Sequence, residues 1–411
     1  MTQDKALEIL KGDSNVFLTG QPGAGKTYTI NQYIDWLIDN GRTPTITAST
    51  GIAAVHVSGQ TLHSWAGLRD DKKLTDIDID DILGNSYTLR RMTTAEVLII
   101  DEISMVSAQL LDNVERLTRT ARQNTTPFGG IKVVLVGDFF QLPPVKGAFA
   151  FEAKAWEQAN FQVCYLHEQH RQDDKIFNDI LTGIRAGHLE EEQKQVIRNR
   201  VIVDVSGMEG VIRLETHNDA VDRMNQMKLE RLASTPKTYE MTSRGNERAI
   251  KALKANCLSP ERLILKVGAP VLFTRNDRDL RWVNGTQGKV VEMDTNSVKV
   301  EIGVSGEVVK VTEVEWERSE GYGKNKNTIA AISQLPLKLA WAITIHKSQG
   351  MTLDKAIIDV SRVFATGHAY VAVSRVRSLD GLYLQGRLTA GFLAVDDKVI
   401  NRDKEFLTVG M

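Results

Sequence analysis

The chain has 411 residues, 42% of them hydrophobic and 25% charged, which is typical of a globular protein with two or more domains. Its 51 Lys and Arg residues nearly balance its 52 Asp and Glu residues, for a net charge of −1, so composition gives no support for nucleic-acid binding. No apolar run reaches the length of a membrane helix, and the opening MTQDKALEILKGDSN lacks the apolar core of a signal peptide. Cys164 and Cys257 show no metal-ligand spacing, so we expect a reduced, cytoplasmic protein with no structural metal and no membrane partner.

Apolar runs alternate with helical periodicities along the first 165 residues. Strands are predicted at 15–20, 43–48, 96–101 and 131–138, and helices at 25–40 and around Leu110, Leu111, Val114 and Leu117. Buried strands that alternate with helices indicate a parallel sheet covered on both faces. A second α/β unit is expected after residue 165, with strands at 211–215, 355–361 and 381–385, a helix that begins at Asn218 and another from about 367 to 377.

Two segments interrupt this pattern. In 285–318, Val298, Val300 and Ile302 alternate with Lys299 and Glu301, a period of two that predicts a small β module inserted into the second unit. The sequence RDDKKLTDIDIDDILGN at 69–85 is rich in aspartate, and we expect it to form a solvated surface hairpin or loop.

The sequence GQPGAGKT contains the spacing Gly20-x-x-x-x-Gly25-Lys26-Thr27, between a predicted strand and a predicted helix. Gly20, Gly23 and Gly25 let backbone N–H groups approach phosphates, and the helix N-terminus adds its positive end. Lys26 would neutralise the β- and γ-phosphates, and Thr27 would place its hydroxyl on Mg²⁺. The segment therefore predicts a P-loop that binds ATP and Mg²⁺.

An acidic pair, Asp101-Glu102, closes another predicted strand. Such a pair is usually a helix cap, but downstream of a P-loop Asp101 is expected to hold Mg²⁺, and Glu102 to orient and deprotonate the attacking water. An ATP hydrolase is favoured. A kinase stays open, because its acceptor site would not be visible in these residues.

Three more side chains could act at the γ-phosphate. Gln141 follows a strand in GDFFQLPPV, and its spacing fits a γ-phosphate sensor or a polar turn equally well. Arg171 and Arg375 lie in the second unit, from which an arginine could stabilise charge on the transferring phosphoryl group. From residue type alone, both arginines would be expected at the surface.

Seven segments occur in the order found in superfamily-one DNA helicases: LTGQPGAGKT, ITASTGIAA, GQTLHSWAGL, LIIDEISMVSAQLLDNVERLTRTARQ, PFGGIKVVLVGDFFQLPPV, WAITIHKSQGMTLDKAIIDV and AYVAVSRVRSLDGL. The DEISM segment followed by PFGG resembles the signature of the Pif-one family, and the matches run from Gln3 to about Leu384. The resemblance implies an α/β fold of two RecA-like P-loop NTPase-type parallel-sheet domains with a small inserted SH3-like β module. It places the first domain at 1–68 and 92–165, a wedge-type insertion at 69–91, the second domain at 166–228 and 335–411, and the inserted domain at 229–334.

The same resemblance implies a monomeric, ATP-driven helicase that moves along single-stranded DNA from 5′ to 3′. Gln3 falls where the family reads adenine, and Gly350 would lie near the γ-phosphate. The match also favours the ATP-site role for Gln141, Arg171 and Arg375, beside Lys26, Thr27, Asp101 and Glu102.

Residues expected in the DNA groove are also implied by matching motifs: Thr50, Gly51, His63, Ser64, Trp65, His346, Lys347 and Ser348. Hydroxyls, loop N–H groups and one cation can hold phosphates without a large net charge. Trp65 could stack on a base or could be a core residue that anchors its loop, and the two histidines could equally be structural.

Two positions depart from the family pattern. His368 replaces a glutamine before AYVA, and Met92 stands where a tryptophan is common. The chain is close to a bare helicase core, as in bacterial or phage relatives.

The leading hypothesis is a DNA-stimulated ATPase that unwinds duplex at junctions with single-stranded DNA, and no protein partner in replication or repair can be identified. The alternative is a nucleotide switch that grips DNA or displaces bound proteins without processive unwinding. A phosphotransferase unrelated to DNA is disfavoured by the second unit.

Overall fold

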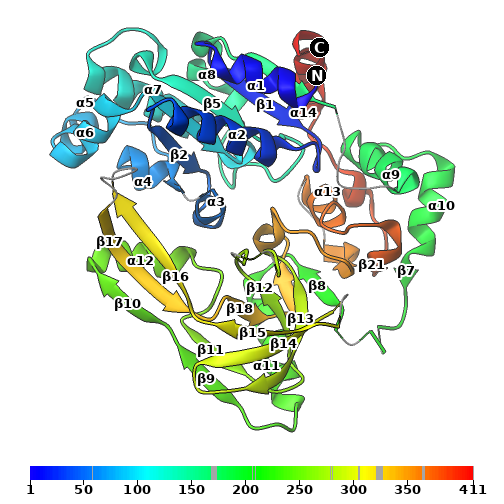
Figure 1. Ribbon diagram of the computed structural model, residues 1–411. Coiled ribbons are helices and arrows are strands. Elements are labelled where there is room, and N and C mark those ends of the chain that lie inside the picture. The colour runs from blue at the N-terminus through cyan, green and yellow to red at the C-terminus, as the bar shows by residue number, and fades with distance from the viewer. Residues whose placement is uncertain are drawn as a thin grey trace. The chain divides into compact units, whose positions relative to one another are not determined.

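The structure is a computed structural model that describes residues 1–57, 59–167, 174–205, 207–208, 210–277, 279, 281–303, 306–320, 327–362 and 366–410. These residues form two compact units (Figure 1). The first contains Met1–Lys175, Arg185–Gly187 and Ala394–Met411, and the second contains Ile176–Ile184 and His188–Leu393. No described helix combines the length and the apolar character that crossing a bilayer requires.

The first unit is built on a parallel sheet with the strand order β3-β2-β4-β5-β1-β6. Its strands are β1 (Val16–Gly20), β2 (Pro44–Ala48), β3 (Gln60–Thr61), β4 (Val97–Asp101), β5 (Lys132–Val136) and β6 (Gln162–Leu166). Its helices are α1 (Gln3–Lys11), α2 (Lys26–Asp39), α3 (Gly51–His56), α4 (Leu62–Ala66), α5 (Asp76–Leu83), α6 (Ser86–Thr94), α7 (Ala108–Arg122), α8 (Lys154–Ala159) and α14 (Asp397–Val409). The strands and helices predicted for this part of the chain are confirmed, with ends shifted by a few residues.

Both faces of this sheet are covered. Val16 and Leu18 of β1 belong to a core cluster with residues of α1 and α2. Phe17, between them, points to the other face and meets Trp156 of α8 and Phe406 of α14 at ring-centroid distances of 5.1 and 5.0 Å. Continuous apolar strands are the pattern that this two-sided burial requires.

The acidic segment at 69–85 is helical in part, so the expected hairpin or loop is wrong. Thr75 starts α5 with a capping box in which its hydroxyl and the Asp78 carboxylate each satisfy a backbone N–H. Arg116 of α7 donates to the Leu74 carbonyl at 2.7 Å and pairs with Asp76. The aspartates therefore cap and tether a helix, a role that their composition alone did not reveal.

The C-terminal helix α14 belongs to the first unit, whereas the sequence-based boundary counted 335–411 with the second domain. The reason is Phe406, which is 5% exposed and packs on the aromatic side chains under β1. The other predicted domain boundaries stay predictions.

The second unit holds a parallel sheet with the order β19-β8-β20-β21-β7. Its strands are β7 (Val201–Ile202), β8 (Ile212–Glu215), β19 (Ala342–Thr344), β20 (Ala356–Asp359) and β21 (Leu382–Gln385), and helices α9 (Lys175–Arg185), α10 (Glu191–Asn199), α11 (Asn218–Arg231) and α13 (His368–Val373) accompany it. The predicted strands at 211–215, 355–361 and 381–385 are confirmed, as is the helix that begins at Asn218. The helix predicted at 367–377 is shorter, since it ends at Val373.

Residues 229–339 of this unit are mostly antiparallel. One sheet has the order β15-β14-β13-β12-β18, and smaller sheets have the orders β10-β17-β16 and β11-β9. The elements are β9 (Lys237–Glu240), β10 (Thr242–Gly245), α12 (Glu247–Asn256), β11 (Arg262–Leu265), β12 (Pro270–Phe273), β13 (Gln287–Met293), β14 (Ser297–Ile302), β15 (Val308–Thr312), β16 (Val314–Glu320), β17 (Asn327–Gln334) and β18 (Leu337–Leu339). Val298, Val300 and Ile302 lie in one buried cluster, as their alternation predicts, and an SH3-like form remains a prediction.

Candidate functional site

The glycine-rich loop runs from the end of β1 to the start of α2. A Cβ on Gly20, at φ +149°, would lie 2.7 Å from the Leu166 carbonyl oxygen, and Gly25 caps α2 in a left-handed conformation at φ 86°. The Lys26 ammonium donates to the carbonyls of Gly20 at 2.7 Å and Gln21 at 3.1 Å. The loop therefore holds its cation at the N-terminus of a 14-residue helix, which is the geometry of an anion site.

Gln3, the first residue of α1, lies against this loop. Its Nε2 donates to the Ala24 carbonyl at 3.4 Å, and a Cβ on Gly25 would come within 2.0 Å of it. At the other end of α1, the Lys132 ammonium donates to the carbonyls of Leu10 and Gly12. Burial lowers the pKa of Lys132 to about 8. The structure thus brings Gln3 to the P-loop on an anchored helix.

The acidic pair lies where β4 ends. Asp101 accepts the Glu102 N–H at 2.9 Å, and burial raises the pKa of the Asp101 carboxyl. Glu102 has φ 51°, a strained conformation for a residue with a side chain and one that is found at functional sites. The partly buried Asp101 carboxylate and the Thr27 hydroxyl are hard oxygen donors of the type that suits Mg²⁺, and a bound cation would favour the charged form of Asp101.

Gln141 belongs to a tight turn after β5. Its N–H donates to the Asp138 carbonyl at 3.0 Å, and the Asp138 carboxylate accepts the Phe140 N–H at 3.2 Å. Asp138 is fully buried and Gln141 is 7% exposed. Burial lowers the pKa of Lys26, and Asp138 and then Glu102 oppose that shift. The turn that carries Gln141 is therefore part of the electrostatic surroundings of the P-loop lysine.

Of the two arginines predicted for ATP hydrolysis, Arg375 lies in the second unit. Arg171 lies outside the described residues. Arg375 is 3% exposed, and its guanidinium donates to the Val371 carbonyl at 2.9 Å and to the Ser374 hydroxyl at 2.8 Å. Gly350 has φ 74° in the second unit. The roles of these three residues remain predictions.

The DNA-groove candidates of the first unit lie around α3 and α4. Thr50 caps α3 by accepting the Ala53 N–H at 3.2 Å, and Gly51 is the first residue of that helix. His63 of α4 pairs with Asp71, and Ser64 is its partly buried neighbour. Trp65 is 1% exposed, which favours the core role over base stacking, and its place in the DNA groove stays a prediction.

In the second unit, His346, Lys347 and Ser348 form a short 3₁₀ turn. Ser348 is fully buried and donates its hydroxyl to the Ile345 carbonyl at 2.7 Å, and its role in the DNA groove stays a prediction. Burial lowers the pKa of His346, whose ring centroid lies 5.6 Å from that of His368. Lys347 supplies a positive charge to this turn, as expected for a contact with phosphates.

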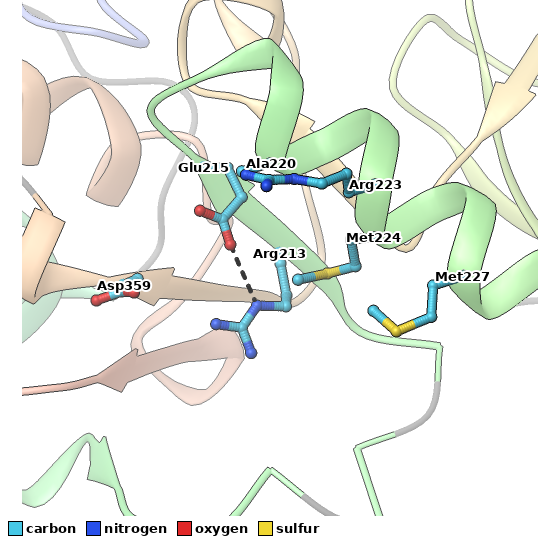
Figure 2. Close-up of a pocket in the computed structure, with 7 residues that line it drawn as sticks. All are labelled: Arg213, Glu215, Ala220, Arg223, Met224, Met227 and Asp359. Atoms are coloured by element: carbon cyan, nitrogen blue, oxygen red, sulfur yellow. Dashed lines mark ion pairs between the residues drawn. The ribbon is translucent and has the colours of Figure 1, made fainter.

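A cavity of about 280 Å³ lies where β8 and β20 end (Figure 2). Arg213 and Glu215, both on β8, form an ion pair of 3.5 Å in its lining. The remaining lining residues are Ala220, Arg223, Met224 and Met227 of α11 and Asp359 of β20. None of the residues predicted from the sequence lines this cavity.

Comparison with known proteins now identifies the family. Residues 5–195 match the family model described as PIF1-like helicase, and residues 250–293 match that of the DNA helicase Pif1 2B domain. The ATP-dependent DNA helicase Pif1 of Bdellovibrio bacteriovorus is 38% identical over 408 residues, covering 98% of this chain and 91% of that protein. The chain belongs to the Pif1-like helicase family.

Solved structures of Pif1-family members are similar to this chain along almost all its length. Bacteroides Pif1 in complex with ADP-AlF4 has a TM-score of 0.88 at 30% identity, covering 99% of this chain and 97% of that one. Bacteroides Pif1 bound to single-stranded DNA has a TM-score of 0.66 at 30% identity, with the same coverage. The α/β fold with a RecA-like parallel-sheet core is therefore confirmed.

Sequence reasoning missed one group beside the P-loop of this Pif1-family chain. Asp138 forms ion pairs with Arg185, which in turn pairs with Asp403. Asp138 could have been found, because it ends an apolar run just as Asp101 does. Arg185 and Asp403 are 218 residues apart, and no local signal joins them.

Proposed function

We propose that this chain is an ATP-dependent DNA helicase that moves along single-stranded DNA from 5′ to 3′ as a monomer and unwinds the duplex ahead. The observation that carries the ATPase part is the loop in which the Lys26 ammonium lies on the carbonyls of Gly20 and Gln21 at the start of α2. Membership of the Pif1-like family supports the coupling of this site to DNA.

Each residue near the loop has a chemical task in this proposal. Gln3 reads the adenine, Lys26 binds the β- and γ-phosphates, and Gln141 senses the γ-phosphate. Thr27 and Asp101 hold Mg²⁺, which would neutralise charge on the phosphates. Glu102 orients the attacking water and accepts its proton. Arg171 and Arg375 stabilise charge on the transferring phosphoryl group, and Gly350 lies near it.

Single-stranded DNA is the proposed polymer substrate, as it is for the Bacteroides Pif1 solved with that ligand. Thr50, Gly51, His63 and Ser64 would hold phosphates from the first unit, and His346 and Lys347 from the second. Hydroxyls, N–H groups and few cations suit a protein whose net charge is −1, because the grip then depends on placed groups and not on a general positive field.

Strand separation on tailed duplexes tests this proposal. With ATP and Mg²⁺, a duplex with a 5′ single-stranded tail should be unwound, and one with a 3′ tail should not. Lys26→Ala should abolish unwinding and ATP hydrolysis while the affinity for single-stranded DNA stays within about threefold, or ~0.7 kcal/mol, because Lys26 is not among the proposed DNA contacts. Lys154→Ala, at an exposed lysine of α8, is the matched control. A normal rate of ATP hydrolysis in Lys26→Ala would refute the assignment of the P-loop as the ATP site. ATP hydrolysis without strand separation in the unmodified chain would favour a remodelling ATPase.

A further inference from the structure

A buried cluster of three charged residues, which we call the Arg185 cluster, lies in the first unit beside the Gln141 turn. Its members are Asp138, Arg185 and Asp403, whose side chains are 0%, 9% and 13% exposed. Arg185 donates to both carboxylate oxygens of Asp403, at 3.0 and 3.2 Å, and to Asp138 at 3.4 Å. A forked guanidinium between two carboxylates fixes the positions of all three side chains.

The cluster is joined to the turn in two ways. The Asp138 carboxylate accepts a hydrogen bond from the Phe140 N–H, and the Asp138 carbonyl accepts one from the Gln141 N–H. The Arg185 guanidinium also lies 3.8 Å from the centre of the Phe140 ring, so the turn is held through an ion pair and through a cation–π contact. A displacement of Arg185 would therefore move the backbone that orients Gln141.

The cluster also reaches the P-loop lysine electrostatically. Asp138 is the foremost of the carboxylates that favour the charged form of Lys26, and Arg185 acts in the opposite direction.

The C-terminal helix α14 supplies the other side of the cluster. Asp403 accepts hydrogen bonds from the Tyr165 hydroxyl, at 3.2 and 3.4 Å, as well as from Arg185. One turn further along α14, Phe406 packs on Phe17 of β1, directly before the P-loop. Asp403 is therefore fixed by Tyr165 and by the packing of α14 on β1, and it holds the Arg185 guanidinium in place.

We propose that Arg185 is a positioning residue for ATP hydrolysis, held by Asp403 of the C-terminal helix against the turn that carries Gln141. The inference rests on the proposed ATPase function. It assigns α14 a part in catalysis although none of its residues belongs to a helicase motif. Because Gln141 is expected to act on the γ-phosphate during transfer, its misplacement should lower kcat more than it raises KM for ATP.

The test uses the full chain with two single variants and their combination. Asp403→Asn and Arg185→Met should each lower kcat about tenfold while KM changes less than about threefold, because the lost interaction is one made in the transition state. Arg185→Met leaves the two carboxylates of Asp138 and Asp403 without their shared cation, so its Tm should fall most, whereas Asp403→Asn keeps the Arg185–Asp138 pair and should lose less Tm. The double variant removes one of the two carboxylates that Arg185→Met leaves behind, so its Tm should lie above that of Arg185→Met while kcat stays low. Glu405→Gln, which removes an exposed carboxylate of the same helix that pairs with Arg402, is the control and should leave kcat and KM unchanged.

Two results would overturn the inference. One is an unchanged kcat in both single variants. The other is a kcat that recovers together with the Tm in the double variant, because the cluster would then only balance charge. Basal turnover without DNA is measured in parallel. If DNA failed to stimulate the unmodified chain, the helicase proposal would fail, while the variants would still test the cluster through basal turnover.

Discussion

Replacement of Trp65 separates a core role from a base-stacking role. Trp65 is 1% exposed in α4, a helix that begins with a Thr61 cap and carries His63 and Ser64 beside it. Trp65→Leu keeps an apolar side chain but removes the ring face on which a base could stack. Trp65→Phe keeps a ring with less volume, so the two variants form a matched pair.

The magnitude follows from burial. A buried tryptophan removes roughly 150–250 Å² from water, worth at most ~4–6 kcal/mol at ~25 cal/mol per Å². Leucine restores about half of this, so Trp65→Leu should lower the free energy of unfolding by ~2–3 kcal/mol. For a unit of this size that corresponds to a fall in Tm of roughly 4–12 °C. A stacked base would instead contribute ~1–3 kcal/mol to binding, or about 5- to 160-fold in Kd.

Thermal unfolding and the anisotropy of a labelled oligothymidine measure the two quantities on the same preparation. The core role predicts a lower Tm for Trp65→Leu and a Kd for DNA within about threefold of the unmodified chain, a difference below ~0.7 kcal/mol. The Tm of Trp65→Phe should lie between those of the unmodified chain and Trp65→Leu. A Tm within about 2 °C combined with a Kd weakened about tenfold or more, with Trp65→Phe binding normally, would refute the core role.

Three further predictions concern the P-loop, α1 and the 3₁₀ turn. Gly20→Ala should abolish ATP hydrolysis, because its Cβ would meet a backbone carbonyl of β6 at 2.7 Å. Gly41→Ala is the control: its Cβ would have no atom within 4 Å, so this variant should lose only ~1 kcal/mol of stability from its positive φ and keep the full rate of ATP hydrolysis. Burial lowers the pKa of Lys132 to about 8, so between pH ~8 and ~10.5 the unfolded chain binds more protons at this residue than the folded chain does, and the contribution of Lys132 to stability rises with pH. In urea titrations, the free energy of unfolding of the unmodified chain minus that of Lys132→Met should therefore increase across that window. A constant difference would contradict the lowered pKa of Lys132. Lys347→Ala should reduce the slope of log Kd for single-stranded DNA against log salt by about 0.7, and an unchanged slope would remove Lys347 from the phosphate contacts.

The parts of the fold that the sequence predicted are those in which local pattern and burial agree. β1, β4 and β5 are short apolar runs, and each lies between helices on both faces of one sheet, so their composition reports their surroundings directly. The P-loop was predictable for a similar reason. Its glycines, its lysine and the start of α2 are adjacent in sequence, and the chemistry needs them in that order.

The parts that the sequence did not predict depend on contacts between distant segments. The 69–85 segment is acidic enough to favour a loop, but its helix is tethered by Arg116 of α7, which no local pattern announces. Residues of α14 gave no sign that Phe406 would pack under β1 or that Asp403 would hold Arg185. Trp65 and Ser348 lie in motifs that suggest DNA contact, and no local pattern indicates that their side chains are 1% and 0% exposed.

The most direct test of the central claim is the steady-state rate of ATP hydrolysis with and without an unstructured single-stranded DNA, measured across a range of salt concentrations. Coupling between the P-loop and a DNA groove predicts stimulation of about tenfold or more that weakens as salt rises and disappears in Lys26→Ala. A rate that DNA leaves unchanged at every salt concentration would contradict the assignment of this chain as a DNA-driven motor.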